Sequence, residues 1–142
     1  MNNVASAISK LPWGVSCSIK IVGEMNTDIL SDIKTAIKNN SNSRFSLDLS
    51  QTTGLSEIPD SAFSNCQHSL TSVIIPNGVT SIGDSAFYWS SSLTSIIFED
   101  TSTWYYTSKD DYTGGTVIDV TDPTQNATYL KSTYDDKYWY KK

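Results

Sequence analysis

The sequence predicts an α/β protein: a short solenoid of repeated strand units that share a parallel sheet, with a cap at each end. Hydrophobic segments recur every 23 or 24 residues in the middle of the chain, a helical pattern flanked by strand patterns precedes them, and aromatic residues gather after them. A chain of 142 residues that is 38% hydrophobic has room for one core. We therefore expect a single domain over 1–142, divided into an N-terminal cap at 1–44, repeats at 45–100 and a C-terminal cap at 101–142.

Two pairs of segments carry the repeat. Residues 70–75 (LTSVII) return as residues 93–98 (LTSIIF), and residues 55–63 (LSEIPDSAF) return as residues 79–87 (VTSIGDSAF). A period this short is typical of a solenoid in which each turn contributes one strand and apolar side chains at fixed positions stack inside. The pairs expected to stack are Leu70 with Leu93, Val73 with Ile96, Ile75 with Phe98, Leu55 with Val79, Ile58 with Ile82, and Phe63 with Phe87.

These residues resemble the 23-residue leucine-rich repeat of BspA-like bacterial surface proteins, also called the treponemal type, over about residues 47–99. That family usually has cysteine three residues after the repeat phenylalanine; Cys66 fits the pattern, whereas Ser90 stands in the second copy. The resemblance implies a leucine-rich repeat solenoid, a cell-surface or extracellular setting, and adhesion to a host or bacterial surface or matrix protein.

The residues before the repeats predict a strand-helix-strand cap. Hydrophobic residues alternate over 17–21 and again over 45–49, and those of 29–37 share one face of a helix for which Thr27 is the expected N-cap. A right-handed helical crossover would make the two strands parallel and shield the first repeat. A shorter amphipathic helix is expected before them, over about residues 4–11.

The residues after the repeats predict a cap built from aromatic side chains, because 9 of the 16 aromatic residues lie beyond residue 100. We expect strands at 103–106, 116–120 and 138–140, with a short helix capped by Asp122 and begun by Pro123. A terminal cap of this kind covers the last strand of a repeat array. The aromatic residues expected in its core are Trp104, Tyr129 and Trp139.

Charge and hydropathy argue against two classes of partner. No lysine or arginine lies between Phe45 and Ser108, whereas six acidic residues do, so we expect no nucleic-acid binding. No apolar run approaches the roughly 18 residues that a membrane span needs, so we expect no membrane insertion. The first residues lack the basic and apolar segments of a secretion signal, and we expect no signal peptide in this chain.

Catalytic and cofactor chemistry is sparse in the sequence, so we expect no enzyme, no cofactor and no metal site. The only histidine, His68, falls in a loop, and the sequence has no nucleophile elbow, phosphate-binding glycine loop or zinc-binding Cys/His spacing. Cys17 and Cys66 are interpreted as two buried thiols. Calcium is a minor alternative, because hard oxygen ligands occur at Asp110, Asp111, Asp119 and Asp122.

The candidate binding surface is the concave face of the repeat strands. Ile74 and Ile97 occupy positions that the BspA-like family usually fills with a polar residue. Their spacing of 23 residues should place them side by side on adjoining strands, about 4.8 Å apart, next to Thr71 and Thr94. An exposed apolar stripe of this kind favours a protein partner.

Two further features bear on this surface. The C-terminal segment could instead fold back and bury the stripe under Trp104 or Tyr106, an alternative that we weigh equally. Tyr88 and Trp89, in the loop after the second repeat phenylalanine, are the expected loop contacts.

Three functions remain open from the sequence. The leading hypothesis is a non-enzymatic protein-recognition or adhesion module that binds through the concave face and the repeat loops. A second is a structural unit that self-associates weakly through the Ile74/Ile97 stripe. A third is a carbohydrate-binding or hydrolytic domain, which predicts a cleft where an aromatic face lies beside two acids.

Overall fold

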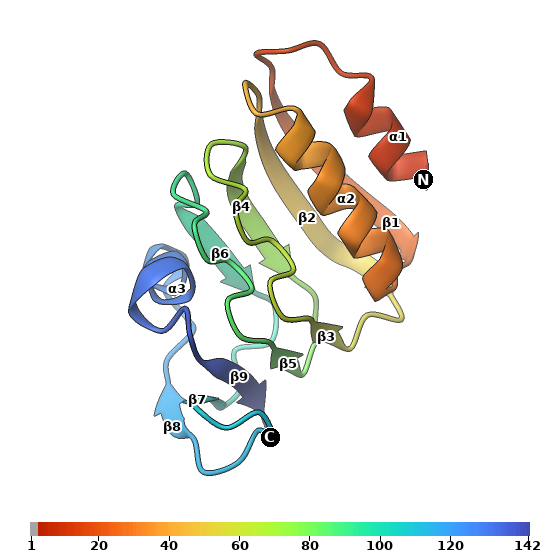
Figure 1. The fold of residues 1–142 in the computed structure, drawn as a ribbon. Coiled ribbons are helices and arrows are strands. Elements are labelled where there is room, and N and C mark those ends of the chain that lie inside the picture. The colour runs from red at the N-terminus through yellow and green to blue at the C-terminus, as the bar shows by residue number, and fades with distance from the viewer. Residues whose placement is uncertain (1–2) are drawn as a thin grey trace.

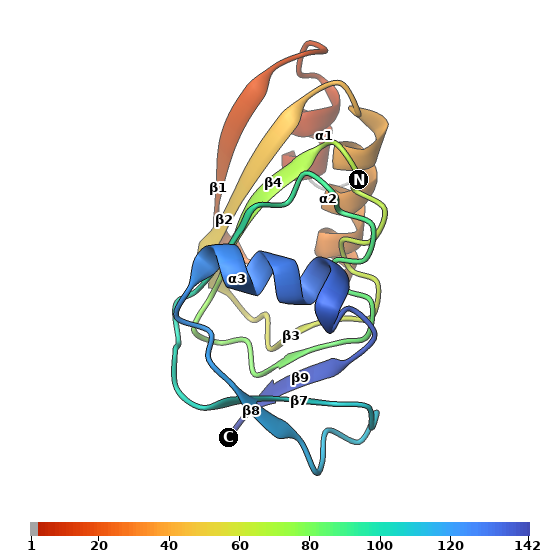
Figure 2. The ribbon, with the colours of Figure 1, turned by 90° about the vertical axis from the view of Figure 1, so that its left-hand side faces the viewer.

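The computed structural model describes residues 3–142 and has a mixed α/β fold with two sheets (Figure 1). Two helices pack on one side of the first sheet, and the second sheet lies at the far end of the molecule (Figure 2). The elements are α1 (Asn3–Ser9), β1 (Ser16–Glu24), α2 (Thr27–Asn39), β2 (Arg44–Thr53), β3 (Glu57–Ile58), β4 (Leu70–Ile75), β5 (Ser81–Ile82), β6 (Ser95–Phe98), β7 (Trp104–Thr107), β8 (Thr116–Ile118), α3 (Pro123–Thr128), a π-helical turn (Tyr129–Thr133) and β9 (Tyr138–Lys141).

The first sheet is parallel throughout, with strand order β1-β2-β4-β6. Val73 pairs with Ile96 and Ile75 pairs with Phe98, so side chains 23 residues apart lie on adjoining strands. Their inward side chains are buried, as alternation along a strand requires. The predicted α/β class with a parallel sheet is confirmed.

The second half of each repeat also stacks in register. Strand β3 pairs in parallel with β5 through Ile58 and Ile82, and the buried rings of Phe63 and Phe87 stack 5.5 Å apart. The turns approach closely, because a Cβ atom added at Gly83 would lie 2.5 Å from the backbone nitrogen of Asp60. Glycine at this position therefore lets one turn pack against the backbone of the turn before it.

Serine replaces the family cysteine in the second repeat without disturbing the core. Cys66 is a buried free thiol, and Ser90 is buried at the equivalent place. The Ser90 hydroxyl donates a hydrogen bond of 2.7 Å to the carbonyl oxygen of Phe63, so its polar atom has a partner. The prediction of two buried thiols was wrong for Cys17, which is half-buried because its strand, β1, lies at the edge of the sheet.

The N-terminal strand-helix-strand unit forms as β1, α2 and β2. Leu30, Ile33 and Ile37 of α2 are buried against the sheet. The prediction of Thr27 as the N-cap was wrong by one residue: Asn26 Oδ1 accepts a hydrogen bond of 2.9 Å from the Ile29 amide, and Thr27 is the first helical residue. Asn26 precedes the helix with extended backbone, as a capping residue does.

The C-terminal strands β7, β8 and β9 add to the repeat strands β3 and β5 to form the second sheet, whose strand order is β3-β5-β9-β7-β8. Trp104 and Trp139 are buried and their rings contact Phe98, with centroids 4.9 and 6.3 Å away. Tyr129 is half-buried, short of the full burial expected of it, and β8 ends at Ile118, two residues earlier than expected.

Helix α3 lies along the open side of β6 (Figure 1). It begins as predicted, because the Asp122 carboxylate accepts hydrogen bonds from the amides of Thr124 and Gln125, and Pro123 is the first helical residue. The buried Asn126 amide donates to the carbonyl oxygens of Ile96 and Val120, at 2.9 and 2.8 Å. This side of the sheet is therefore closed by side-chain hydrogen bonds.

Candidate functional site

The outward face of the first sheet carries two rows of side chains in register. These rows cross all four strands, because each outward position pairs with the equivalent position on the next strand. One row is Ser18, Ser46, Ser72 and Ser95, and the other is Lys20, Asp48, Ile74 and Ile97.

Ile74 and Ile97 are register partners, and together they form the apolar end of the second row. Ile97 is 41% exposed and Ile74 is half-buried. Trp104 packs on the core side against Phe98, and Tyr106 stacks on Tyr134 at 4.1 Å. The C-terminal segment therefore leaves Ile97 exposed, and the alternative in which Trp104 or Tyr106 buries the stripe was wrong.

The serine row lies between the stripe and Thr71 and Thr94, whose hydroxyl groups are occupied by the backbone. Thr71 Oγ1 donates to the carbonyl oxygen of Phe45 at 3.1 Å, and Thr94 Oγ1 donates to that of Thr71 at 3.3 Å. The Thr94 amide also donates to the Thr71 carbonyl oxygen at 2.9 Å. The Thr71 hydroxyl therefore links β4 to β2, and the Thr94 hydroxyl and amide link the start of β6 to β4.

The charged end of the second row was missed by sequence reasoning. Asp48 is hydrogen-bonded by Ser50, whose side chain and backbone amide hold the pKa of the carboxyl below its usual range, with a smaller effect from the Lys20 ammonium. The alternation of hydrophobic residues in the sequence does predict that the residues between them, Lys20 and Asp48 among them, face outward. What the sequence lacked was the register that sets Lys20 and Asp48 in line with Ile74.

The predicted loop contacts form a separate site. The rings of Tyr88 and Trp89 stack 5.6 Å apart and are 40% and 56% exposed. Trp89 has a left-handed backbone with φ of 57°, a conformation that bulky residues rarely adopt. Gln67 and Ser91 line the shallow hollow beside Trp89. None of the residues of the two outward rows is among its lining residues, so the loop site is separate from the sheet face.

A second hollow, of about 350 Å³, lies at the other end of the repeats. Glu57, Pro59, Asp60 and Tyr112 line it. Burial raises the pKa of the Tyr112 phenol above its usual value, and the ring packs edge-on against Tyr138 with centroids 5.5 Å apart. An aromatic side chain beside two acids is the combination that the carbohydrate hypothesis requires.

Within residues 3–142, no group of three or more histidine, cysteine, aspartate and glutamate side chains is arranged to hold a metal ion. Three of the four acids considered for calcium accept local hydrogen bonds: Asp111 from Thr113, Asp119 from Thr121, and Asp122 from Thr124 and Gln125. His68 is exposed in its loop.

The helices of the described chain are short, and the longest, α2, has 13 residues. None of those between residues 3 and 142 combines the length and the apolar character needed to cross a bilayer.

The parallel strands, the stacked phenylalanines and the repeated turns are the geometry of a leucine-rich repeat. The family model for the BspA type leucine rich repeat region (6 copies) matches residues 27–112, more than half of the chain. This chain belongs to the BspA-type leucine-rich repeat family. Repeats of this BspA type are commonly associated with protein binding, are generally non-catalytic, and occur in typically surface-associated proteins. No curated protein and no solved structure matches the chain.

Proposed function

We propose that this chain is a non-enzymatic recognition module of a bacterial surface protein, which binds a host or bacterial surface or matrix protein through its concave sheet face and repeat loops. The contact residues are Thr71, Ile74, Thr94 and Ile97 on the face and Tyr88 and Trp89 in the loop. The family supports a protein partner, and the open apolar stripe supports this face.

The observation that carries the proposal is the conformation of Trp89. The equivalent residue one turn earlier is Asn65, which has nearly the same φ, 61°, and suits it far better. A non-glycine residue held in the left-handed region costs on the order of 1–3 kcal/mol. A bulky aromatic in that conformation, stacked on Tyr88 and open to solvent, serves a contact better than it serves the fold.

The proposed organisation is one domain, a short leucine-rich repeat solenoid at 45–100 between caps at 1–44 and 101–142. The stacking of β2, β4 and β6, and of β3 on β5, supports it. Only about two full repeats contribute to the concave face, so the contact area is small. A single copy should bind weakly, and several copies on one cell would strengthen attachment by avidity.

The direct test measures binding to a panel of immobilised, purified extracellular-matrix proteins by biolayer interferometry. We expect Ile74→Asp/Ile97→Asp and Trp89→Ala each to weaken binding about tenfold or more, since central apolar contacts dominate interface energies. Val117→Asp is the matched control, because Val117 is 62% exposed on β8, in the other sheet. Equal capture of wild type and Ile74→Asp/Ile97→Asp would contradict the role of the concave face.

The hollow beside Tyr112 supports a second candidate function, carbohydrate binding. Its test is a glycan array with wild type and Glu57→Gln. Glu57 is the better position to change, because Asp60 Oδ1 accepts a hydrogen bond of 2.9 Å from the Asp84 amide and therefore also supports the fold. Glycan binding that Glu57→Gln abolishes would favour this function, and an array without signal would remove it.

A further inference from the structure

The two edges of the first sheet differ in how their backbone groups are covered. At one edge, Asn126 and Lys131 donate hydrogen bonds to the carbonyl oxygens of Ile96 and Leu93, at 2.9 and 2.7 Å. At the other edge, the nine-residue strand β1 pairs with β2 alone among residues 3–142. A long edge strand with unpaired backbone groups is a template for another strand.

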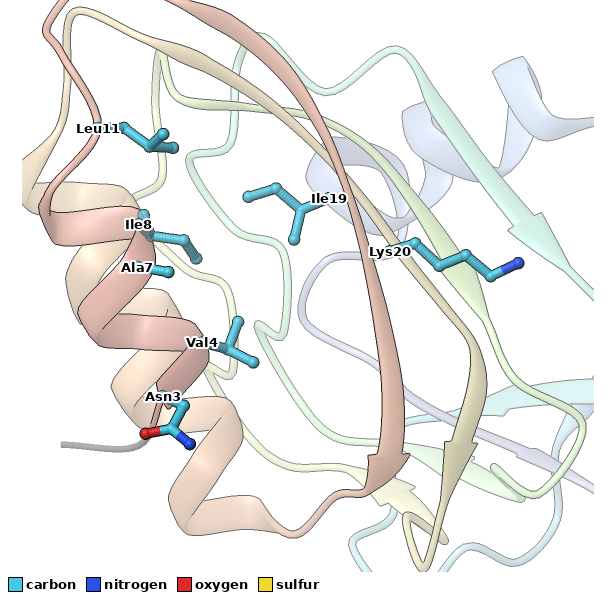
Figure 3. Close-up of a pocket in the computed structure, with 7 residues that line it drawn as sticks. All are labelled: Asn3, Val4, Ala7, Ile8, Leu11, Ile19 and Lys20. Carbon is cyan, nitrogen blue, oxygen red and sulfur yellow. The ribbon is translucent and has the colours of Figure 1, made fainter.

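An apolar groove of about 320 Å³ runs along this open edge, between α1 and β1 (Figure 3). Val4 and Ile8 of α1 line one wall, Leu11 lies just after the helix, and Ile19 of β1 points toward them from the opposite side (Figure 3). Val4, Leu11 and Ile19 pack against the core but are only partly buried. The core is therefore open beside the same strand that, within residues 3–142, has a partner strand on one side only.

The side chains on the outward face of β1 are complementary to themselves. Val22 is 73% exposed, and Lys20 and Glu24 lie two residues before and after it on the same face. A two-fold interface requires that residue i of one copy meets residue j of the other, and the reverse. Antiparallel pairing centred on Val22 meets this requirement, because it sets each Lys20 beside a Glu24 of the other copy.

Other registers are less favourable. Pairing centred on Lys20 would place two ammonium groups directly opposite each other, which destabilises a strand pair. Charge complementarity therefore favours the register centred on Val22 over the one centred on Lys20.

We infer that β1 is a self-association edge, through which two copies of this chain join antiparallel about Val22. The two four-stranded sheets then form one continuous sheet, and the two-fold axis keeps both α1 grooves on the same side of it. This interface uses neither the Ile74/Ile97 stripe nor Trp89, so it is independent of the proposed binding function. It would present two copies of the binding face on one rigid body.

Sedimentation velocity over a wide protein concentration range tests the inference. We expect a concentration-dependent monomer–dimer equilibrium in wild type. Lys20→Glu replaces two attractive pairs by two repulsive ones and should raise the dimer dissociation constant about tenfold or more. Glu24→Lys should do the same, and the double swap Lys20→Glu/Glu24→Lys should restore the wild-type constant to within about threefold.

Each contrary outcome is specific. A wild type that stays monomeric at every concentration would overturn the inference, and so would a double swap as weak as the single variants. Loss of dimer in Ile74→Asp/Ile97→Asp, with Lys20→Glu unaffected, would move the interface to the stripe and overturn the role of β1. All substituted side chains lie on the outward face, and urea unfolding of each variant verifies that the fold is retained.

Discussion

Asn65 and Trp89 have the same left-handed backbone conformation, with φ of 61° and 57°, at equivalent places in successive turns. Ser61 and Ser85 form a second matched pair, both with φ of 57°. The turn of each repeat thus requires a left-handed residue at two fixed positions. Asparagine meets this requirement at low free-energy cost, whereas tryptophan does not.

Trp89→Asn should raise the free energy of unfolding by about 1 kcal/mol, because it removes most of the backbone strain. The same substitution should weaken partner binding, because the exposed ring is lost. Urea denaturation measures the first effect and biolayer interferometry the second. Trp89→Ala is the matched control, since alanine loses the ring but keeps the strained backbone. A Trp89→Asn variant no more stable than Trp89→Ala would contradict the strain argument.

The two thiols should differ in reactivity. Burial raises the pKa of the Cys66 thiol to about 11, so the group stays neutral and shielded at pH 8, whereas Cys17 is half-buried on an edge strand. Ellman's reagent should therefore label one thiol in the folded protein and two after unfolding. Cys17→Ser should abolish the fast reaction and leave the slow one. Rapid labelling of Cys66 in folded Cys17→Ser would show that its site opens readily.

The same pKa shift predicts that the folded state loses stability at alkaline pH. In the unfolded chain the Cys66 thiol ionises near its ordinary value, whereas in the folded chain it stays protonated up to about pH 11. Its contribution to stability is therefore complete below about pH 9 and is lost as the pH rises toward 11.

Because of the Asp100–Lys141 ion pair, the free energy of unfolding should fall at acidic pH. The hydrogen bond from Lys141, with others from Ser102, holds the pKa of the Asp100 carboxyl well below its usual range. A depressed pKa adds stability above the unfolded value near pH 4, and this stability is lost as the pH falls further. Because Asp100 is partly exposed, the contribution should be at most about 1 kcal/mol.

Asp100→Asn tests this contribution. The variant should be less stable than wild type at pH 7, and the difference should shrink steadily as the pH is lowered from 4 to 2. Urea unfolding at a series of pH values measures it. Asp136→Asn is the control, since Asp136 pairs with its sequence neighbour Lys137 and is strongly exposed. A difference between Asp100→Asn and wild type that is constant from pH 7 to pH 2 would contradict the role of the ion pair.

The repeated part of the fold was predictable because the alignment of the repeats with each other also gives the pairing register of their strands. Val73 and Ile96 have the same place in matching segments, and hydrophobic burial leaves one way to stack them. The sequence alone could not assign the N-cap of α2, because asparagine and threonine are both good N-caps. The extended backbone of Asn26 in the structure identifies it as the cap. Cys17 alternates like a core residue, but β1 is the edge strand of its sheet, and no strand within residues 3–142 lies beyond it.

The binding face was only half predictable. Ile74 and Ile97 lie in repeats that align with each other, so their pairing follows from the sequence. Lys20 lies before the residues that match the family repeat, and the strand pairing has register shifts on both sides of β2. The row that links Lys20 and Asp48 to Ile74 therefore depends on backbone geometry that no local pattern reports.

The closed edge of the sheet gives the last prediction. The Asn126 side chain is fully buried and satisfies the carbonyl oxygens of Ile96 and Val120. Asn126→Ala removes both donors and leaves two buried acceptors unpaired, so the free energy of unfolding should fall by about 2–4 kcal/mol. Urea denaturation measures this loss. Thr128→Ala, on the exposed side of the same helix, should change stability by less than about 0.5 kcal/mol. Equal unfolding midpoints for the two variants would mean that α3 covers β6 by packing alone, without the help of this amide.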